Sequence, residues 1–447
     1  MDFDEALRYL LSLGHETVAI KLGLENTEHL LRALGSPQDA FPAVQIAGTN
    51  GKGSTAAVLD RICRAAGIKT GIYTSPHLIS ITERIRTGGL EITPEQFARL
   101  LTLVGGAARN LVDRGELIAL PTFFEHVTAT ALVAFRESGV RLAILETGLG
   151  GRLDATTVAR AGTVAITPIA LDHQEYLGRT LAEIAAEKAA IIRPGVKTIV
   201  APQPPEALEV ILKRCAANGV TPRLVDFEIK VIDADETGRL RASFKTGTDY
   251  YERVRVGLRG RHQLTNAATA IAIAEALRED GLSIPRDAVR EGVECAEHKG
   301  RLELWEGRPS ILFDGAHNAA GARVLRAYLD EFARQRPITL IFGAMRDKAL
   351  DEITATLFPA ADRVIITRPD MARAAEPEEV ARVAVPPGAD SSKITLARGA
   401  CEALKAARAQ TPPLGLICIT GSLYLIGELQ RALLEERAAY PRTSSEH

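Results

Sequence analysis

The chain has 447 residues, of which 46% are hydrophobic and 25% charged, as is typical of a globular protein long enough for two or three domains. Lys and Arg number 54 and Asp and Glu 56, so the near-neutral charge gives no general electrostatic basis for nucleic-acid binding. The five cysteines form no C-x-x-C pair, the N-terminus lacks the basic start of a signal peptide, and no apolar run is long enough to span a bilayer. We therefore expect a cytoplasmic protein without a zinc site or membrane contact.

The first motif in chain order is a glycine-rich loop, AGTNGKGST, at residues 47–55. An apolar run over 43–47 precedes it and predicts a buried parallel strand, and a helix is predicted from Ser54 onward. This strand–loop–helix context indicates a phosphate-binding loop, although its spacing differs from G-x-x-x-x-G-K-[ST]. Lys52 would bridge phosphates, and Ser54 or Thr55 would offer a hydroxyl to a metal or phosphate. The alternative is a glycine-rich turn that contains a lysine.

Polar residues follow the next predicted strands. Glu146 ends a strand predicted over residues 141–148, where a carboxylate can bind magnesium. Asp172 and His173 follow a strand predicted over 162–170, and a neutral imidazole can also ligate a metal. Their ordinary interpretations are a solvated carboxylate in a glycine-rich turn and a structural histidine.

Lys188 lies among alanines and isoleucines in a helix predicted over residues 183–195. A buried ammonium ion is costly, so this lysine would have a lowered pKa or would react with carbon dioxide to form an anionic carbamate. The alternative is a surface lysine whose stem lies along apolar side chains.

The hydrophobic pattern of the sequence changes after this helix. Residues 222–258 alternate apolar and polar side chains, as half-exposed antiparallel strands do, and a helix is predicted over 260–279. Gln263 and Asn266 near its start would read a purine edge or cap the helix. A charged connector over residues 298–310 precedes a second α/β series, so we place a domain boundary near residue 298.

In this second series, FDGAHNAAG places Asp314, His317 and Asn318 between a strand and a helix, where an acidic residue can bond a ribose hydroxyl. GAMRDK and TGSLYLIGE follow strands in the same way. We predict an α/β fold with an N-terminal P-loop ATPase-like domain, whose sheet is mostly parallel, and a C-terminal Rossmann-like α/β domain.

Together the motifs resemble those of the dihydrofolate synthase/folylpolyglutamate synthase family of the Mur ligase superfamily. The resemblance runs from about residue 15 to 437 and rests on AGTNGKGS, TSPHL, LGGRLDAT, LDH, EKAAIIRPG, HQ-x-x-NA, DGAHN and TGSLYL, in this order. It implies that residues 1–297 form an ATP-binding Mur-ligase central-type domain with the folate site. Residues 298–447 would form the C-terminal glutamate-ligase α/β domain.

The resemblance also implies the site residues. Those matching the ATP site are Gly51, Lys52, Gly53, Ser54, Asn266, Arg301 and Asp314. Those matching the magnesium ligands are Ser75, Glu146 and His173. Those matching the pterin and folate contacts are Lys21, Leu22, Gly23, Pro121, Thr122, Phe123, Phe124, Leu153, Asp154 and Ala155, with the two phenylalanines able to stack on a pterin ring. The implied catalytic residues are Lys52, Lys188 as a carbamate, and His317, which would bind glutamate or handle its amine.

The family reaction gives the expected function. A substrate carboxylate takes the γ-phosphate of ATP, and the amine of L-glutamate attacks the acyl phosphate. We expect ATP and two Mg²⁺ ions as cofactors, and dihydropteroate, reduced folates and L-glutamate as substrates. We further expect activity with both acceptors, a monomer, no nucleic-acid partner, and closure of the C-terminal domain over the cleft.

Three positions depart from the family pattern: Glu297-His298-Lys299 stands where a Trp-Pro pair is common, Thr157 replaces asparagine and Ala319 replaces proline. One alternative function is another Mur-type amino-acid ligase, acting on cell-wall precursors or a cyanophycin-like polymer. TSPHL and PTFF favour folate over it. The other alternative is a non-catalytic ATP-binding module, which would not need the metal and carbamate positions together.

Overall fold

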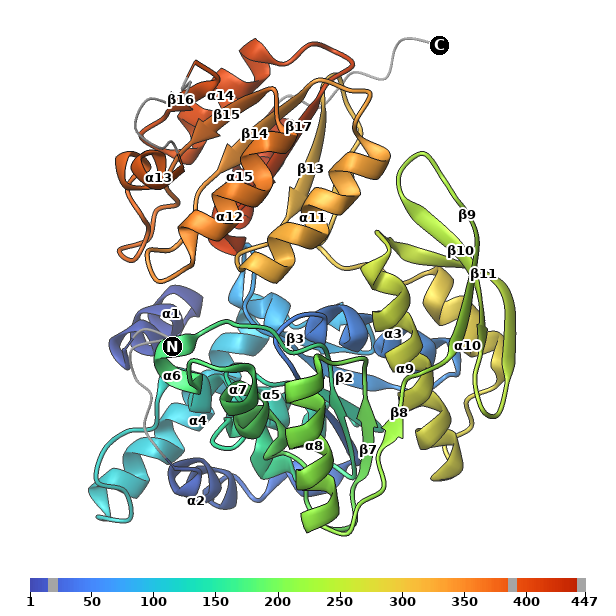
Figure 1. Cartoon of the computed structure of the whole chain (residues 1–447). Coiled ribbons are helices and arrows are strands. Elements are labelled where there is room, and N and C mark those ends of the chain that lie inside the picture. Colours follow the sequence, from blue (N-terminus) through green and yellow to red (C-terminus); the bar gives the residue numbers. More distant parts are fainter. Residues whose placement is uncertain (15–22, 385–391, 440–447) are drawn as a thin grey trace.

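The computed structural model describes residues 1–14, 23–384 and 392–439. This part of the chain forms two lobes, and Figure 1 shows the C-terminal lobe stacked on the N-terminal one. Lys21 and Leu22 lie outside the described residues. No helix in the described ranges is long and apolar enough to cross a membrane.

The N-terminal lobe is built on a large sheet in the order β4-β3-β2-β5-β1-β6-β7-β8. Its strands are β1 (Ala43–Ala47), β2 (Thr70–Tyr73), β3 (Ile85–Thr87), β4 (Leu90–Glu91), β5 (Leu142–Glu146), β6 (Thr163–Ile166), β7 (Lys197–Val200) and β8 (Arg223–Leu224). The six neighbouring strands β2, β5, β1, β6, β7 and β8 pair in parallel, whereas β3 and β4 add an antiparallel edge next to β2. This is the mostly parallel sheet that the alternation of strands and helices predicted.

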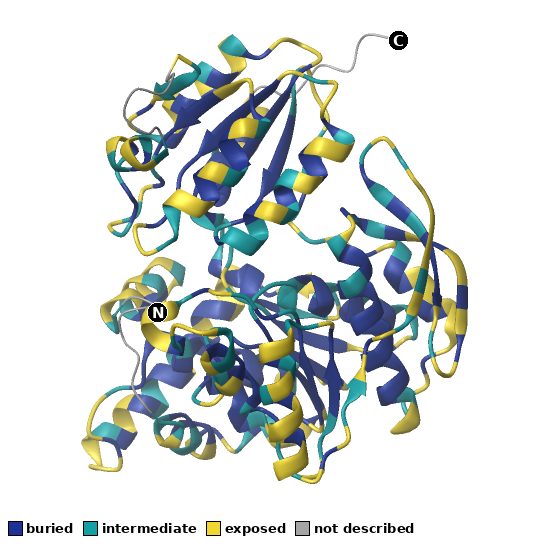
Figure 2. Ribbon diagram, viewed as in Figure 1, coloured by how far each residue is buried: buried dark blue, intermediate teal, exposed yellow. Residues whose placement is uncertain are grey.

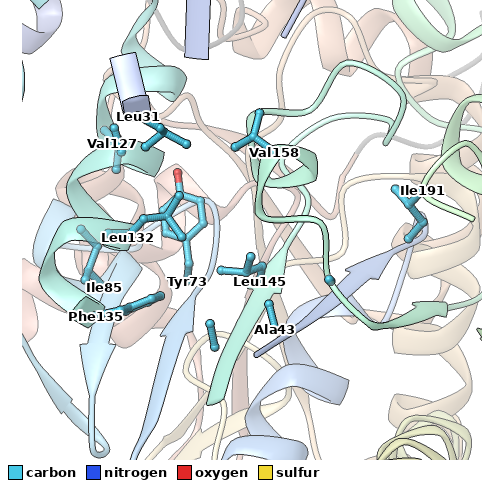
Figure 3. Close-up of a cluster of buried hydrophobic side chains, with 14 of the residues drawn as sticks. Leu31, Ala43, Tyr73, Ile85, Val127, Leu132, Phe135, Leu145, Val158 and Ile191 are labelled. Carbon is cyan, nitrogen blue, oxygen red and sulfur yellow. The ribbon is translucent and has the colours of Figure 1, made fainter. Parts of the chain in front are cut away.

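Helices cover both faces of this sheet, so its side chains are buried on both sides. Successive side chains of a strand point to opposite faces and therefore join different cores. On one face, Ala43, Tyr73 and Leu145 join a core that Figure 3 shows in close-up. The helices that cover this face are α1 (Phe3–Ser12), α2 (Glu25–Ala33), α4 (Pro94–Asp113), α5 (Phe123–Glu137), α7 (Leu181–Ala189) and α8 (Pro205–Ala217). On the other face, Val44 and Ile46 pack against α3 (Lys52–Ala65), α9 (His262–Glu279) and α10 (Arg286–Glu294).

A small antiparallel sheet in the order β11-β10-β9 lies beside α9 and α10 (Figure 1). Its strands are β9 (Glu228–Ala234), β10 (Arg239–Lys245) and β11 (Tyr250–Arg259). The sequence pattern predicted antiparallel strands throughout residues 222–258, and for Arg223 and Leu224 this was wrong. Arg223 and Leu224 extend the large sheet as β8, and the chain then leaves that sheet at Val225, whose side chain is buried in the core.

The C-terminal lobe contains a second sheet in the order β12-β13-β17-β14-β15-β16. Its strands are β12 (Glu303–Trp305), β13 (Ser310–Asp314), β14 (Ile338–Phe342), β15 (Arg363–Ile366), β16 (Ile394–Leu396) and β17 (Leu416–Thr420). Only the pairing of β12 with β13 is antiparallel among the strands described in this sheet. Residues 303–305, predicted as part of a connector, therefore form an edge strand.

Helices cover both faces of this second sheet, and Figure 2 shows its strands almost wholly buried. On one face lie α11 (Ala319–Phe332), α12 (Leu350–Leu357) and α13 (Pro377–Ala384), and on the other α14 (Ala400–Gln410) and α15 (Leu423–Ala439). The short helices are α6 (Gln174–Leu177) and the 3₁₀ turns η1 (Pro37–Ala40), η2 (Ile81–Arg84), η3 (Ala155–Ala159) and η4 (Phe358–Ala360).

The two lobes touch where the loop after β2 rests on α15. A β-carbon at Gly427 of α15 would overlap the carbonyl oxygen of Leu78, so the two backbones are in direct contact. Arg431, one turn further along α15, donates a hydrogen bond to the carbonyl oxygen of Ile79 at 2.6 Å. The same loop carries Ser75, one of the candidate magnesium ligands.

Candidate active site

A cavity of about 780 Å³ lies between the two lobes. The loops that follow β1, β5 and β6 line it from the N-terminal lobe, and those that follow β13, β14 and β17 line it from the C-terminal lobe. The carboxyl ends of both sheets therefore open onto one space, as is usual for ligand sites in open α/β sheets.

Most of the residues singled out from the sequence meet in this cavity. Those that line it are Gly23, Gly51, Lys52, Gly53, Ser54, Ser75, Thr122, Phe124, Glu146, Leu153, Asp154, Ala155, His173, Lys188, Asn266, Arg301, Asp314 and His317. Pro121 and Phe123 do not line it, and Phe123 is buried with the guanidinium of Arg84 over its ring at 5.5 Å. Of the two adjacent phenylalanines, Phe124 alone is placed to contact a ligand here.

The glycine-rich loop leads from β1 into the N-terminus of α3. Gly51 adopts a left-handed conformation (φ +87°), and a β-carbon there would overlap the amide oxygen of Asn266. Helix α3 consequently begins at Lys52, two residues earlier than predicted. The Lys52 ammonium folds back and donates to the carbonyl oxygens of Gly48 (3.1 Å) and Thr49 (3.2 Å). The helix N-terminus and this lysine together form an anion-binding end of the cavity.

Glu146 ends β5 beside this loop and is only 5% exposed. Its Oε2 accepts a hydrogen bond from the backbone N–H of Ser75 at 3.2 Å. Burial raises the pKa of Glu146, and the nearby Lys52 charge acts in the opposite direction. In the described ranges, no group of three or more His, Cys, Asp or Glu is placed to hold a metal ion. A cation bound here would therefore take most of its ligands from hydroxyls, water or phosphate, as Mg²⁺ commonly does.

At the other end of the cavity, Asp172 holds three side chains from the C-terminal lobe. Its Oδ1 lies 2.6 Å from the Lys348 ammonium, and its Oδ2 accepts from Asn318 Nδ2 at 3.0 Å. His317 Nε2 lies 3.4 Å from the same Oδ2. Burial alone would raise the pKa of Asp172, but the hydrogen bond from His317 and the charge of Lys348 hold that pKa well below its usual range.

His173 follows directly and has a strained backbone for a residue other than glycine (φ 50°, ψ 41°). Its Nε2 lies 4.0 Å from Asp172 Oδ2. Burial lowers the pKa of His173 to about 4, so its imidazole is neutral near pH 7 and able to ligate a cation.

Lys188 of α7 links the two ends of the cavity and is 4% exposed. Its ammonium donates to the carbonyl oxygen of Gly48 at 2.8 Å, the same oxygen that Lys52 contacts. Burial first, and then the charge of Lys52, lower the pKa of Lys188 to about 7. Near neutral pH the Lys188 amine is therefore present in both its charged and its uncharged form.

The loop after β5 is held by Asp154. Its buried carboxylate accepts hydrogen bonds from the backbone N–H groups of Gly148 (2.8 Å) and Leu149 (3.1 Å). A β-carbon on Gly148 would lie 2.5 Å from the ring of Phe124, so this loop and the aromatic ring pack directly. They form an apolar wall suited to a flat heterocycle.

The linker between the lobes carries further side chains into the cavity. Arg301 donates to the carbonyl oxygen of Gly315 at 3.2 Å. Asp314 accepts from the backbone N–H groups of Leu302 and Ala316, both at 3.0 Å, and burial raises its pKa. His298 also lines the cavity, and burial lowers its pKa to about 3, so this imidazole is neutral.

Two of these side chains were not selected from the sequence as site residues. Lys348 lies in GAMRDK. The position of this segment after a predicted strand was the one sequence feature that indicated a site residue there. For His298 the sequence offers no comparable signal, because its hydrogen-bond partner Ser54 lies 244 residues away.

Comparisons with known proteins agree with this architecture. Residues 46–274 match the family model of the Mur ligase middle domain, and residues 301–432 match that of the dihydrofolate synthetase C-terminal domain. The dihydrofolate synthase/folylpolyglutamate synthase of Bacillus subtilis is 35% identical over 94% of this chain and 97% of its own length.

A longer relative is the probable bifunctional folylpolyglutamate synthase/dihydropteroate synthase of Haloferax volcanii, 34% identical over 99% of this chain. The present chain spans only 52% of that protein, about half its length. Among solved structures, the Mycobacterium tuberculosis folylpolyglutamate synthase complexed with ADP has a TM-score of 0.89 at 31% identity. That alignment covers 96% of this chain and 98% of the other.

Proposed function

The chain belongs to the dihydrofolate synthase/folylpolyglutamate synthase family, and from this premise we propose that it is an ATP-dependent ligase that joins L-glutamate to a folate carboxylate. The observation that carries this proposal is the single cavity between the lobes. It brings together a phosphate-binding loop, an apolar wall for a heterocycle and a cluster of polar groups from the second lobe. The mycobacterial relative complexed with ADP supports a nucleotide at this site.

The first step is phosphoryl transfer. An oxygen of the acceptor carboxylate attacks the γ-phosphorus of ATP, the bond to the β–γ bridging oxygen breaks, and ADP leaves from an acyl phosphate. Lys52 and the backbone N–H groups at the start of α3 hold the phosphates and stabilise the charge that they carry. Bound Mg²⁺ would supply further charge neutralisation, and Ser75, Glu146 and His173 are the residues that we propose to hold it.

The second step forms the amide bond. The neutral amine of L-glutamate attacks the carbonyl carbon of the acyl phosphate, the carbon–oxygen bond to phosphate breaks, and one amine proton passes to the departing phosphate. His317 faces the cavity from the C-terminal lobe with its Nδ1 2.7 Å from the carbonyl oxygen of Gly315. We propose that it contacts the incoming glutamate. The lobes enclose the acyl phosphate, which limits its hydrolysis.

Lys188 is proposed to carry a carbamate in the active protein. The uncharged amine present at neutral pH attacks carbon dioxide and loses a proton, which converts a buried cation into an anion. An anion at this position would offset the charge of Lys52 and orient ligands of the cation. Incubation with ¹³C-labelled carbon dioxide should give a carbamate carbon resonance in the wild type and none in Lys188→Met.

The proposed acceptors are both dihydropteroate and reduced folates. Phe124 and the loop at Leu153 and Ala155 would contact the heterocycle, which the two acceptors share. Gly23, Thr122 and Asp154 complete this wall in the described ranges. The proposed N-terminal domain, residues 1–297, would hold nucleotide and folate, and residues 298–447 would bring glutamate. A monomer would suffice, since the cavity is formed within one chain.

The testing experiment is ADP release by the purified protein with Mg²⁺, ATP and L-glutamate, with dihydropteroate or tetrahydrofolate as acceptor. Turnover with both acceptors is expected, and each should require glutamate. Lys299→Ala changes an exposed side chain and is the control for effects of mutagenesis and purification. This variant should keep wild-type rates. Absence of turnover with either acceptor would contradict the folate assignment. Nucleotide binding without turnover on any acid would instead favour a non-catalytic module.

A further inference from the structure

His298 lies on the linker between α10 and β12 and packs on the first turn of α3. A β-carbon on Gly53 would lie 2.7 Å from His298 Cε1 and 3.1 Å from its Nε2. Its Nδ1 is 3.1 Å from the hydroxyl oxygen of Ser54, a buried side chain that lines the cavity. The linker is thus attached to the phosphate-binding loop by one hydrogen bond and one close packing contact.

Ser54 Oγ also has a partner on α9, and this second contact occupies one of its two lone pairs. Asn266 Nδ2 donates to Gln263 Oε1 at 2.8 Å, which fixes the amide of Gln263 with its nitrogen toward Ser54. Gln263 Nε2 then donates to Ser54 Oγ at 3.4 Å. With one lone pair of Oγ occupied in this way, the Ser54 O–H is free to donate to His298 Nδ1.

The consequence concerns what Ser54 presents to the cavity. When its proton points to His298 and one lone pair accepts from Gln263, the remaining lone pair of Oγ faces the ligand space. A serine that presents a lone pair binds a cation or accepts a hydrogen bond. A serine that presents its proton donates instead to a phosphate oxygen.

We propose that His298 is a positioning residue of the nucleotide site, which accepts the Ser54 hydroxyl proton at Nδ1 and so orients Ser54 Oγ as an acceptor toward a metal–nucleotide ligand. This inference deepens the proposed function and rests on it. His298 stands on the linker three residues before Arg301, so the same segment that joins the lobes also orders the phosphate-binding loop.

The first test is spectroscopic and requires no ligand. Nitrogen-15 NMR of the ligand-free protein should show His298 as the Nε2–H tautomer, with an unprotonated Nδ1 that accepts a hydrogen bond. The Nδ1–H tautomer would overturn the proposal, because Ser54 would then be the acceptor in that bond. Comparison with His298→Asn assigns the His298 ring resonances, because they are missing from the spectrum of that variant.

The second test measures the affinity for ADP by calorimetry with and without Mg²⁺. His298→Leu keeps much of the volume but removes the acceptor, and we expect its affinity for Mg²⁺·ADP to fall about fivefold, the usual effect of one hydrogen bond. His298→Asn places an amide oxygen near the former Nδ1 and should stay within about twofold of wild type. Affinity without Mg²⁺ should change less.

A double variant separates positioning from a general structural role. Ser54→Ala and the combined Ser54→Ala/His298→Leu should bind Mg²⁺·ADP equally weakly, because the histidine acts through the serine. Glu297→Ala, at the exposed neighbouring position, is the matched control and should bind as the wild type does.

The outcomes distinguish this inference from the proposed function. Equal losses in His298→Leu and His298→Asn, or losses that multiply in the double variant, would overturn the role assigned to His298. A wild-type protein that binds no ADP would instead contradict the proposed function, and the tautomer of His298 would still decide its contact with Ser54. Thermal unfolding of every variant shows whether a loss of affinity comes from a loss of fold.

Discussion

The two ends of the cavity are assembled in different ways. At the phosphate-binding end, Lys52 reaches back to carbonyl oxygens only three and four residues away, on a loop fixed between one strand and one helix. At the other end, Asp172 of the N-terminal lobe is held by Lys348, 176 residues further along the chain. The first end is therefore built mainly within one lobe, with one hydrogen bond from Asn318 of the C-terminal lobe to Asn50 at 3.1 Å, whereas the second end exists only while the two lobes are together. Under the proposed function, glutamate entry and product release should accordingly act on the Asp172 end, and the backbone of the phosphate-binding loop between β1 and α3 should remain formed.

The largest effect is expected at the phosphate end. Lys52→Met removes the cation that we propose holds the transferred phosphate, and we expect the turnover number for ADP release to fall by about 10³-fold or more. Binding of the folate acceptor should change little, because the apolar wall lies elsewhere in the cavity. Turnover within tenfold of wild type would show that the helix N-terminus alone provides the phosphate site.

The next effect should appear at the end shared by the lobes. Asp172→Asn removes the nearer carboxylate of the largely buried Lys348 ammonium and leaves only Asp347 at 3.7 Å, and we expect the free energy of unfolding to fall by about 3 kcal/mol. Urea denaturation measures this loss, and small-angle scattering should show a larger radius for the folded variant. Asp330→Asn breaks the exposed ion pair with Arg326 and is the matched control, with an expected change of about 0.5 kcal/mol or less. Equal losses in both variants would contradict a special role for Asp172.

Lys188 lies between the two ends, and its lowered pKa gives a pH dependence of stability. The pKa is about 7 in the folded protein against 10.5 for an ordinary lysine, so the unfolded chain binds more protons between these pH values. Stability contributed through this residue therefore rises with pH over that window, by about 2 kcal/mol between pH 7 and about pH 9. The measurement is the difference in unfolding free energy between wild type and Lys188→Met in buffers free of carbon dioxide. A difference that stays constant with pH would show that Lys188 is not titrating in this window.

The smallest effect on catalysis is expected at the apolar wall, where two adjacent phenylalanines can be compared. Phe124→Ala should raise the KM of the folate acceptor about tenfold, because its ring lines the cavity. Phe123→Ala should instead lower the free energy of unfolding by about 3 kcal/mol and leave that KM within about twofold, because its ring is buried. Similar KM changes in the two variants would place both rings against the substrate.

The two ends of the cavity also differ in how far the sequence predicts their residues. Lys52 and Glu146 were found because each stands beside a predicted strand in a short motif, and a local pattern suffices to place such residues at the edge of a sheet. The family resemblance added Ser75, Arg301 and other positions whose importance no local pattern indicates. Their roles in binding remain predictions, although the structure brings most of them into one cavity.

The parts that could not be predicted depend on contacts across the fold. The partnership of Lys348 with Asp172, and of His298 with Ser54, joins residues far apart in the chain, and no periodicity encodes it. Apolar runs predicted strands correctly over β1, β5 and β6, whereas the alternation of apolar and polar side chains was the signal over residues 222–258. This alternation could not tell that residues 223–234 belong to two sheets, since both strands satisfy the same local pattern.

The contact of the β2 loop with α15 has a consequence for the order of events in a reaction cycle. Leu78 and Ile79 rest on α15 through Gly427 and Arg431, and the loop that they share with Ser75 also donates to Glu146. The lobes cannot separate without breaking or dragging this loop. We therefore expect opening and the loss of the proposed cation ligands to share one rate constant, so that ADP and its cation would leave in a single kinetic step.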